Sequence, residues 1–436
     1  MHLRISVLIG LWSWASLSAQ PWPLVQLGEG LPGQTGPCEP DIAIDPENPL
    51  RIVAGSVLRN VYTSQDGGHN WTTARLESPL GVYGDPCLVA DGRGNFYYFH
   101  LSDPDQKGWG SPRFLDRIVV QRSKARNGTD WSRGQSIGHR PPKQQDKEWV
   151  DVSADGKTLY CAWTEFDAYG STSERDRSRI VFSSGTRKGQ KWSEPVVVSQ
   201  TEGNCLDGDE TAEGATPAAG LGDAVYLTWA LNGNLFFSSS ADRGRTWTPE
   251  RIIGFQTGGW SQDVPGFDRS NGMPVLVCDR SRGFQQGSLY LMYSEQKGSD
   301  IDVVVRVSRD GGLSWSPATP IHPVGDSSVQ FMPWIAVDQS TGRVHAVFYD
   351  RQRRPGEEGL HPWATHVVHA WSANGFDWNQ ERLTVEPFVP SPKAFMGDYN
   401  AIDVVGGIVR PVWTELHEGR LSIWTALIEM KTPSQP

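Results

Sequence analysis

The feature that most limits the possible fold is a short motif that recurs along the chain. Three close copies of it end at Trp71, Trp247 and Trp315, and three weaker copies end at Trp131, Trp192 and Trp378. These six tryptophans follow one another at intervals of 55 to 68 residues. Self-similarity at such a period is typical of propellers and other repeat arrays, in which each repeat is one supersecondary unit. The pattern S-x-D-x-G-x-x-W fits three segments closely: SQDGGHNW (64–71), SADRGRTW (240–247) and SRDGGLSW (308–315).

Each repeat contains the same order of short apolar segments separated by turn residues. In the first repeat these segments are CEPDIAID, RIVAGS, NVYTS and WTTARLE, and the third repeat has WVDVSAD, TLYCAWTE, RIVFSS and WSEPVVVS. Runs of this length and composition are typical of strands. Four antiparallel strands in about 60 residues make one blade of a propeller.

The number of blades follows from the ends of the chain. After Trp378 there are three more strand-like segments, YNAIDVV, IVRPVWTEL and RLSIWTALIEM, but no further motif. Near the N-terminus, WPLVQLG resembles the strand that elsewhere follows the tryptophan. We therefore predict an all-β propeller of seven blades, in which the N-terminal strand joins the C-terminal blade and removes the exposed sheet edges. Six blades remain an alternative if one weak copy is not a blade.

The first twenty residues have the pattern of a secretory leader. MHLRISVLIGLWSWASLSAQ carries one Arg, an apolar run and then small residues, which predicts a signal peptide over 1–19 with cleavage near Ala19. We expect a single propeller domain over 20–436 that is secreted or periplasmic, is not inserted in a membrane and is a monomer. The formal net charge of −10 argues against nucleic acid as a partner.

The polar residues of the motif have a structural explanation. The Asp can accept backbone N–H bonds within the turn, the Ser hydroxyl can anchor its start, the Gly can adopt a positive φ, and the Trp can pack between sheets. Six such turns around the rim of a ring cannot converge on one substrate. We therefore assign structural roles to Ser64, Asp66, Gly68, Trp71, Ser240, Asp242, Gly244, Trp247, Ser308, Asp310, Gly312 and Trp315.

Candidate chemistry falls at the opposite end of the blades, where the inner strands begin. Aligning CEPD, GDPC, KEWV and GDYN places Glu39, Asp85, Glu148 and Asp398 on four consecutive blades. Crowded carboxylates raise one another's pKa or share a cation. Three interpretations stay open for these four residues: an acid/base pair for glycan cleavage, a calcium or magnesium site, or hydrogen bonds to the backbone of the next blade.

Loops on the same face add binding candidates. In YDRQRRPGEEGLHPW, Arg351 and Arg353 could clamp an acidic or sulfated sugar while Trp363 stacks on its ring, and Arg59 lies in the corresponding loop of the first repeat. Glu165 and Asp167 occupy that loop in the third repeat. A solvated charged loop explains any one of these residues equally well.

Metal and disulfide chemistry have weaker support in the sequence. The loop CLDGDETAEG (205–214) could bind calcium through Asp207, Asp209 and Glu210, although it lacks the EF-hand spacing. No cofactor is certain, and calcium is the one that the carboxylates permit. Five cysteines allow at most two disulfides and leave one thiol over.

The repeated motif resembles the Asp box, or BNR repeat, of the sialidase superfamily. That resemblance implies a propeller that acts on glycans. GDYNAIDVVGGIVRPVWTE is similar to the sialidase segment in which a nucleophilic Tyr precedes a strand that ends in Glu, which places these roles on Tyr399 and Glu415. Sialidases carry an Arg-Ile-Pro motif where this chain has Glu39-Pro40-Asp41. The resemblance therefore implies a divergent member without the full arginine triad, and we do not expect true exo-sialidase activity.

Two functions remain open. The first is a glycoside hydrolase-like enzyme that acts at the axial mouth of the propeller. The alternative is a non-catalytic propeller that binds a glycan or protein partner through its loop-rich face. For the enzyme, the candidate catalytic residues are Glu39, Asp85, Glu148, Asp398, Tyr399 and Glu415.

Overall fold

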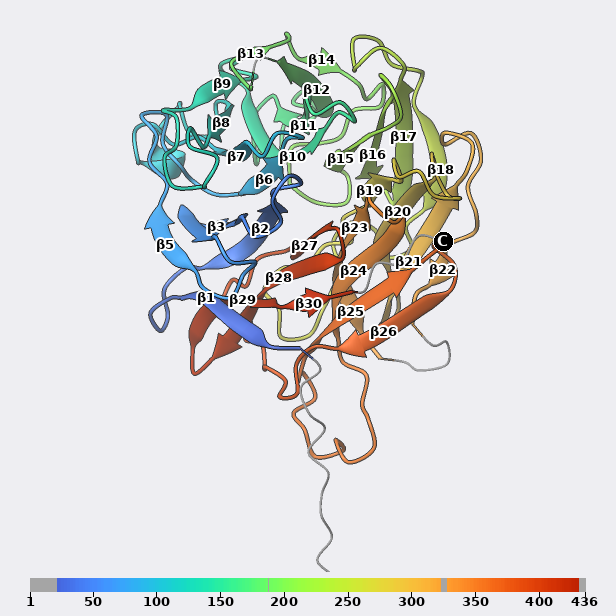
Figure 1. Ribbon diagram of the computed structural model, residues 1–436. Coiled ribbons are helices and arrows are strands. Elements are labelled where there is room, and N and C mark those ends of the chain that lie inside the picture. Colours follow the sequence, from blue (N-terminus) through green and yellow to red (C-terminus); the bar gives the residue numbers. More distant parts are fainter. Residues whose placement is uncertain (1–21, 187, 323–327, 431–436) are drawn as a thin grey trace, which may run out of the picture.

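The computed structural model describes residues 22–186, 188–322 and 328–430, and these form seven β-sheets arranged as the blades of one propeller (Figure 1). In these segments a short 3-10 helix, η1 (Gly108–Gly110), is the one helical element. None of the described residues belongs to a helix with the length and apolar character needed to cross a membrane. The expected signal peptide, 1–19, lies outside the described residues.

Blades 1 to 3 each take consecutive strands, and the first strand of each lies nearest the axis. The strands of blade 1 are β2 (Cys38–Ile44), β3 (Ile52–Val57), β4 (Asn60–Ser64) and β5 (Thr72–Arg75). Those of blade 2 are β6 (Cys87–Ala90), β7 (Phe96–Leu101), β8 (Ile118–Arg122) and β9 (Gln135–Ile137). Those of blade 3 are β10 (Gln144–Val152), β11 (Leu159–Phe166), β12 (Ser178–Thr186), β13 (Lys191–Trp192) and β14 (Val196–Val197).

Blades 4 to 6 follow the same plan. The strands of blade 4 are β15 (Glu213–Ala219), β16 (Val225–Leu231), β17 (Asn234–Ser240) and β18 (Arg251–Phe255). Those of blade 5 are β19 (Val275–Cys278), β20 (Leu289–Lys297), β21 (Asp300–Ser308) and β22 (Thr319–Pro320). Those of blade 6 are β23 (Gln330–Asp338), β24 (Arg343–Asp350), β25 (His366–Ser372) and β26 (Trp378–Arg382).

Blade 7 closes the ring with strands from both ends of the chain. It contains β27 (Ala401–Val405), β28 (Ile408–His417), β29 (Arg420–Ala426) and the short β30 (Ile428–Glu429), and its outer strand is β1 (Leu24–Glu29). β1 pairs antiparallel with β29, with Leu24 opposite Ala426 and Glu29 opposite Ser422. The predicted seven blades and the predicted closure by the N-terminal strand are therefore confirmed, and the six-blade alternative is wrong.

The motif turns join the third and fourth strands and are held by one hydrogen-bond pattern. In all three copies the Ser Oγ accepts the backbone N–H of the Gly four residues later at 2.8 Å. The Trp Nε1 donates to the carbonyl of that Gly at 2.8 to 3.1 Å, and the Asp Oδ1 accepts the N–H of the residue four positions later at 2.9 Å. These contacts are the structural roles that the sequence predicted for the motif.

The motif also ties each blade to the one before it. Trp247 of blade 4 packs against Phe182 of blade 3 with a ring separation of 4.9 Å, and Trp315 of blade 5 packs against Phe237 of blade 4 at 5.7 Å. Gly244 has a φ of +80°, and a Cβ at this position would collide with the ring of Phe182. The motif glycine is thus required for its backbone conformation and for the packing between blades.

Replacing Gly244 by Ala should lower the free energy of unfolding by about 2–4 kcal/mol, because left-handed strain and overpacking against Phe182 add together. Gly222 is a matched control, since its φ is +63° and nothing lies within 4 Å of the Cβ position. Gly222→Ala should cost only the strain, about 1–2 kcal/mol. Urea unfolding of both variants measures the difference, and equal losses would show that the Phe182 contact contributes nothing.

The five cysteines are all buried and none forms a disulfide. Burial is the largest factor that raises the pKa of each thiol, including those of Cys38 and Cys87. The disulfides that the sequence left open are therefore not present, and the cysteines act as small core side chains.

Candidate active site at the axial mouth

The inner strands begin with an irregularity that directs their first side chains toward the axis. In β2, β10 and β23 two residues lie opposite one residue of the second strand, which is a β-bulge. Four non-glycine residues at this level have positive φ, which favours glycine and stores strain. They are Glu39 (51°), Asp85 (50°), Lys147 (54°) and Met332 (49°).

The bulges correct the sequence alignment in blade 3. The residue equivalent to Glu39 is Lys147, since Asp41 and Trp149 are the first paired residues after the bulge in their strands. The alignment had instead placed Glu148 there, one residue too late. The ring of strand starts therefore contains a lysine between its acidic residues.

Charged side chains from several blades meet at this end of the axis, and we call them the axial cluster: Glu39, Asp85, Asp146, Lys147, Asp207, Glu213, Arg269 and Asp398. Lys147 Nζ lies 2.9 Å from Asp398 Oδ2, and both side chains are buried, with exposed fractions of 3% and 1%. Arg269 Nη2 lies 2.7 Å from the same Asp398 oxygen and 3.7 Å from Glu39 Oε1. Asp398 is thus bound by two cations.

Arg269 reaches the cluster from the connection between blades 4 and 5. Its guanidinium lies over the ring of Phe395, 5.2 Å from the centroid, and its Nη1 lies 3.4 Å from Asp207 Oδ2. Asp207 also accepts the hydroxyl of Tyr169 at 2.5 Å. The side chain of Arg269 is 42% exposed, so it forms the outer surface of the cluster above the buried carboxyls.

The environment moves the pKa values of the two central carboxyls in opposite directions. Burial, followed by the charge of Asp398, raises the pKa of Glu39 well above its usual range. Burial alone would raise the pKa of Asp398, but the charges of Arg269 and Lys147 hold it below the usual range. The environment therefore favours the protonated form of Glu39 and the ionised form of Asp398.

Asp85 and Tyr399 complete the surroundings of this pair. Burial is the largest factor that raises the pKa of Asp85 and that of Tyr399, and the charges of Glu39 and Asp85 add to the shift of Tyr399. Among the described residues the Tyr399 hydroxyl has no hydrogen-bond partner. A phenol in this environment is protonated and is a poor nucleophile.

Glu148 lies near the cluster, where the charges of Asp85, Asp146 and Lys147 act on it, and Glu415 binds other partners. Glu148 is 1% exposed, neither of its oxygens has a hydrogen-bond partner among the described residues, and burial raises its pKa well above the usual range. Glu415 accepts bonds from Trp413 Nε1 at 2.7 Å and from His417 Nε2 at 2.6 Å. Glu415 is therefore paired with His417 and is not the partner of Tyr399.

The predicted sugar-binding residues are only partly brought together. Arg351 is 8% exposed and stacks on Phe331 at 5.2 Å, and burial lowers its pKa to about 10. Arg353 donates to the His361 carbonyl, and Trp363 is half-buried where Gly266 passes over its ring. These side chains contribute to packing among the loops of blade 6. Arg59 is exposed at the turn between β3 and β4 of blade 1, and it is far in the sequence from the loops of blade 6.

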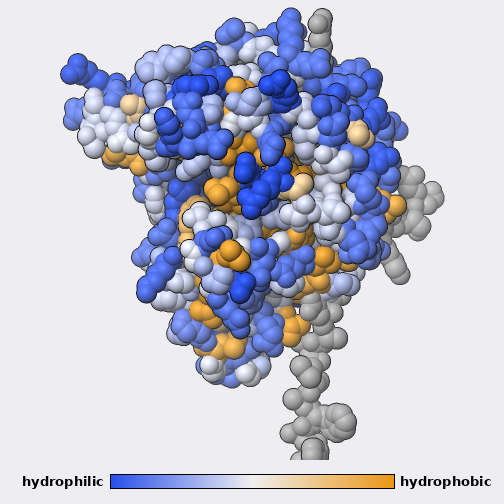
Figure 2. Space-filling view, turned by 90° about the vertical axis from the view of Figure 1, so that its left-hand side faces the viewer, coloured by the Kyte–Doolittle hydropathy of each residue, from blue (hydrophilic) through white to orange (hydrophobic). Residues whose placement is uncertain are grey.

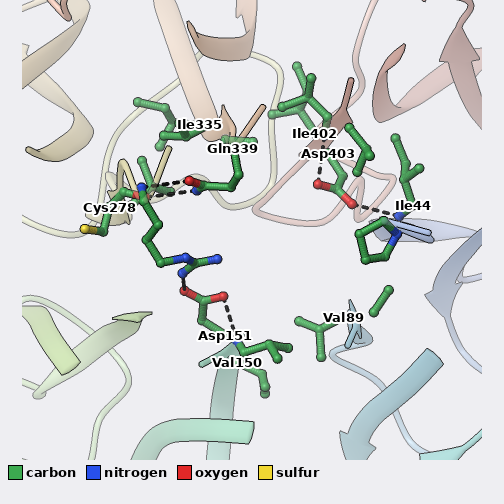
Figure 3. Close-up of a pocket in the computed structure, with 18 of the residues that line it drawn as sticks. Ile44, Val89, Val150, Asp151, Cys278, Ile335, Gln339, Ile402 and Asp403 are labelled. Atoms are coloured by element: carbon green, nitrogen blue, oxygen red, sulfur yellow. Dashed lines mark hydrogen bonds and ion pairs between the residues drawn. The ribbon is translucent and has the colours of Figure 1, made fainter. Parts of the chain in front are cut away.

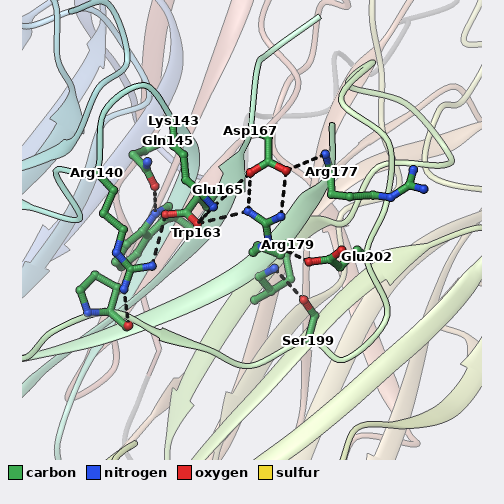
Figure 4. Close-up of polar contacts among 12 residues, drawn as sticks. Arg140, Lys143, Gln145, Trp163, Glu165, Asp167, Arg177, Arg179, Ser199 and Glu202 are labelled. Atoms are coloured by element: carbon green, nitrogen blue, oxygen red, sulfur yellow. Dashed lines mark hydrogen bonds and ion pairs between the residues drawn. The ribbon is translucent and has the colours of Figure 1, made fainter. Parts of the chain in front are cut away.

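Glu165 and Asp167 belong to an ion-pair network at the edge of blade 3 (Figure 4). Glu165 is buried and lies 3.0 Å from Lys143 Nζ and 3.5 Å from Arg140 Nη1. Arg179 Nη1 lies 2.8 Å from Asp167, and its hydrogen bond holds the pKa of Asp167 below the usual range. Each carboxylate of this network is paired with an arginine or lysine. The network therefore stabilises the loop and contains no unpaired carboxylate that could react.

The three carboxylates of the loop that could bind calcium each have protein partners. Asp207 binds Tyr169 and Arg269, Asp209 accepts the N–H of Ser261 at 2.7 Å, and Glu210 accepts from Asn204 at 3.2 Å. In the described part of the chain, no group of three or more His, Cys, Asp or Glu side chains is placed to hold a metal ion. At the axial mouth, Lys147 and Arg269 supply positive charge to the carboxylates.

Other inner-strand carboxylates connect the blades. Asp41 Oδ2 accepts the N–H of Leu88 at 2.5 Å, Asp151 Oδ2 that of Ala219 at 2.8 Å, and Asp403 Oδ2 that of Ile44 at 2.7 Å. The sequence had offered this role as one explanation for Glu39 and its equivalents. The hydrogen bonds to the next blade are made instead by Asp41, Asp151 and Asp403, which lie further along the inner strands.

Asp41 and Asp403 should make stability fall as pH rises from 5 to 8. Burial raises the pKa of Asp41 to about 7 and that of Asp403 to about 6, against about 3.9 in an unfolded chain. At these two groups the folded protein binds more protons than the unfolded chain in this window, and the stability they contribute is lost as pH rises through the folded-state pKa values. His100 and His366, whose pKa values are lowered by burial to about 4, act in the opposite direction. Urea unfolding of wild type and Asp41→Asn across the window tests this, because the slope of stability against pH should be less negative in the variant. A slope that Asp41→Asn leaves unchanged would contradict it.

A cavity of about 580 Å³ lies along the axis toward the motif face (Figure 3). Trp149 and Trp334 line this cavity. Their rings are 4.3 Å apart, and both rings also contact Tyr399. The polar groups in it bind one another, with Arg280 Nη1 3.0 Å from Asp151. Asp41 and Asp403, whose pKa values are raised by burial, line this cavity, and the rings of Trp149 and Trp334 lie between it and Tyr399.

No family model and no curated protein sequence matches this chain. Among solved structures, the chain is similar to an ulvan lyase bound to -[GlcA(1-4)Rha3S]-, with a TM-score of 0.53 and 12% identity, over 93% of this chain and 96% of that one. The likeness shows the fold.

Weaker similarity extends to an arabinofuranosidase and to a sialidase among the solved structures. An α-L-arabinofuranosidase from Fusarium graminearum has a TM-score of 0.49 and 12% identity, over 81% of this chain and 94% of that one. A sialidase from Trypanosoma rangeli in complex with sialic acid has a TM-score of 0.45 and 12% identity, over 82% of this chain and 55% of that one.

Proposed function

We propose that this protein cleaves glycans at its axial mouth, with Glu39 as the general acid and Asp398 as the ionised carboxylate. The observation that carries the proposal is the contact of Asp398 with both Lys147 and Arg269, beside Glu39, whose pKa is raised by burial. Two carboxyls whose environments separate their pKa values can divide acid and base roles. Glycoside hydrolysis uses two carboxyl groups that are about 5 Å or more apart, so Glu39 and Asp398 must separate when Arg269 moves aside to admit a substrate.

Each carboxyl has a defined task in this reaction. Glu39 donates its proton to the oxygen of the leaving sugar, and Asp398 stabilises the positive charge that develops on the ring or activates a water. The raised pKa of Tyr399 favours a carboxylate mechanism over the Tyr-Glu nucleophile of the sialidase resemblance. The motif turns, which resemble Asp boxes, serve as scaffold on the opposite face.

The charge of the cluster favours neutral or amino sugars over sialic acid. Both cations already bind carboxylates, so the carboxylate of an incoming acidic sugar would have to displace Asp398 or Asp207. The carboxylate of the sugar would then lie close to the displaced carboxylate, and like charges that lie close together repel each other. The proposal is thus a glycoside hydrolase with a sialidase-like scaffold and without exo-sialidase activity.

The alternative is a non-catalytic propeller that binds a glycan or protein partner through its loops. One observation favours it: Glu39 and Asp398 are only 3% and 1% exposed, because Arg269 covers them. In an enzyme Arg269 must move aside to admit the substrate, whereas a binding protein would use only the outer surface.

A screen of released sugar separates the two functions. Purified protein is incubated with neutral, amino, uronic, sulfated and sialylated oligosaccharides, and new reducing ends are measured. The proposal expects release from a neutral or amino glycan, and unchanged release by Asp268→Asn, which removes an exposed charge beside Arg269. Binding without release of any sugar would favour the alternative.

The leader-like segment 1–19 supports export, which N-terminal sequencing of the mature protein checks.

A further inference from the structure

A second feature of the same face is a group of aromatic rings, which we call the aromatic platform: Tyr83, Trp109, Phe114 and Tyr169. Trp109 is 59% exposed, and Tyr83 is 38% exposed. The ring of Trp109 lies 4.8 Å from that of Phe114 and 5.0 Å from that of Tyr169, and Tyr83 contacts Phe114 at 4.5 Å. Contacts on two sides hold the exposed indole in one orientation.

The platform is assembled from three separate connections on the face where the inner strands begin. Tyr83 precedes β6, Trp109 lies in η1 between β7 and β8, and Tyr169 lies between β11 and β12. This is the face that carries the axial cluster. Because the loops come from blades 2 and 3, the platform is part of the folded face and not of one loop alone.

A chain of contacts leads from the platform to the proposed catalytic pair. The hydroxyl of Tyr169 donates to Asp207 at 2.5 Å, Asp207 lies 3.4 Å from Arg269, and Arg269 lies 2.7 Å from Asp398. A ligand that lay on Trp109 would therefore have its next unit near Asp207 and Arg269, at the covered entrance to the pair.

The chemistry of the platform suits a sugar ring. A fixed, exposed indole offers a flat apolar face, and preorganisation lowers the entropy lost on binding. The neighbouring Asp105 is half-buried and offers carboxylate acceptors for hydroxyl groups, although Arg113 and Ser111 already bind it. The side of the molecule shown in Figure 2 is mostly hydrophilic, with apolar side chains in separate patches.

We propose that the aromatic platform is a subsite that stacks one pyranose unit of an oligosaccharide while the adjoining unit occupies the axial mouth. This rests on the proposed function for the nature of the ligand. It makes the protein selective for chains of several sugars over a single terminal sugar, since a monosaccharide cannot reach both places.

Binding of oligosaccharides by the Trp109→Ala variant tests the platform without requiring turnover. The probes are cello-, manno- and chitosan-oligosaccharides of one to six units, measured by calorimetry with wild type, Trp109→Ala and Trp109→Phe. Wild type should bind a hexamer of at least one series, and Trp109→Ala should weaken that binding at least about tenfold. Trp109→Phe should restore part of it, and binding of the monosaccharide should stay equally weak in all three.

Phe284→Ala is the control, because Phe284 is 97% exposed on a loop between β19 and β20, on the opposite face. Its binding should equal that of wild type. A wild type that binds none of the hexamers, or a Trp109→Ala variant that binds them unchanged, would overturn the platform. Binding that depends on Trp109 without any sugar release would overturn only the proposed catalysis, and release with unchanged binding would overturn only the platform.

Discussion

Glu39→Gln should lower the turnover of an unactivated glycan by about 10²–10⁴-fold, the usual contribution of a general acid. The amide keeps the size of the side chain but has no proton to give to the leaving oxygen. Because burial and the charge of Asp398 raise the pKa of Glu39, the acid form of Glu39 should persist to higher pH than that of an ordinary glutamic acid. The alkaline limb of its pH profile should disappear in the variant.

The leaving group makes this prediction specific. An aryl glycoside with a strongly acidic phenol needs little protonation, so Glu39→Gln should cleave it nearly as fast as wild type does. Steady-state rates on an aryl glycoside and on the matching disaccharide measure the split, with Asp268→Asn as the control on the same face. Equal losses on both substrates would show that Glu39 supports the structure and does not act as the acid.

Lys147→Met should lower the free energy of unfolding by about 3–5 kcal/mol, the usual cost of leaving one member of a buried ion pair. Lys147 and Asp398 are 3% and 1% exposed, and their contact is 2.9 Å. Without Lys147, Asp398 keeps only the half-exposed Arg269. Adding Asp398→Asn to Lys147→Met should recover part of the loss, because the amide carries no charge.

Urea unfolding of the single and double variants measures this coupling. Lys157→Met is the matched control in the same blade, since Lys157 is 64% exposed and 3.7 Å from Asp155. Exposed pairs contribute about 0–1 kcal/mol, so this variant should be close to wild type. Similar losses in Lys147→Met and Lys157→Met would contradict the buried pair.

The fold could be predicted from the sequence because its signals are local. In the three close copies of the motif the serine, glycine and tryptophan bind one another within eight residues, and the tryptophan spacing marks the blades even where the Asp is lost. At Trp378, for example, the ring still donates to the Gly375 carbonyl at 3.1 Å. The N-terminal strand was recognisable because β1 repeats the composition of other fourth strands.

The site was only partly predictable because it depends on register and on contacts between distant loops. Glu39, Asp85 and Asp398 were found at the strand starts, but the bulge in β10 moved Lys147 into the place assigned to Glu148. Arg269 reaches Asp398 and Glu39 across the ring, and no local pattern marks it. No sequence pattern shows whether Trp109 or Trp363 is the more exposed. Only their packing shows that it is Trp109.

The most direct test of the central claim is a crystal structure of Glu39→Gln soaked with an oligosaccharide that the wild type cleaves. The account predicts a sugar at the axial mouth with the scissile oxygen in hydrogen-bond contact with residue 39, Asp398 beside the same ring and Arg269 displaced. A sugar bound in the cavity beyond Trp149 and Trp334, with the axial mouth still closed by Arg269, would contradict it.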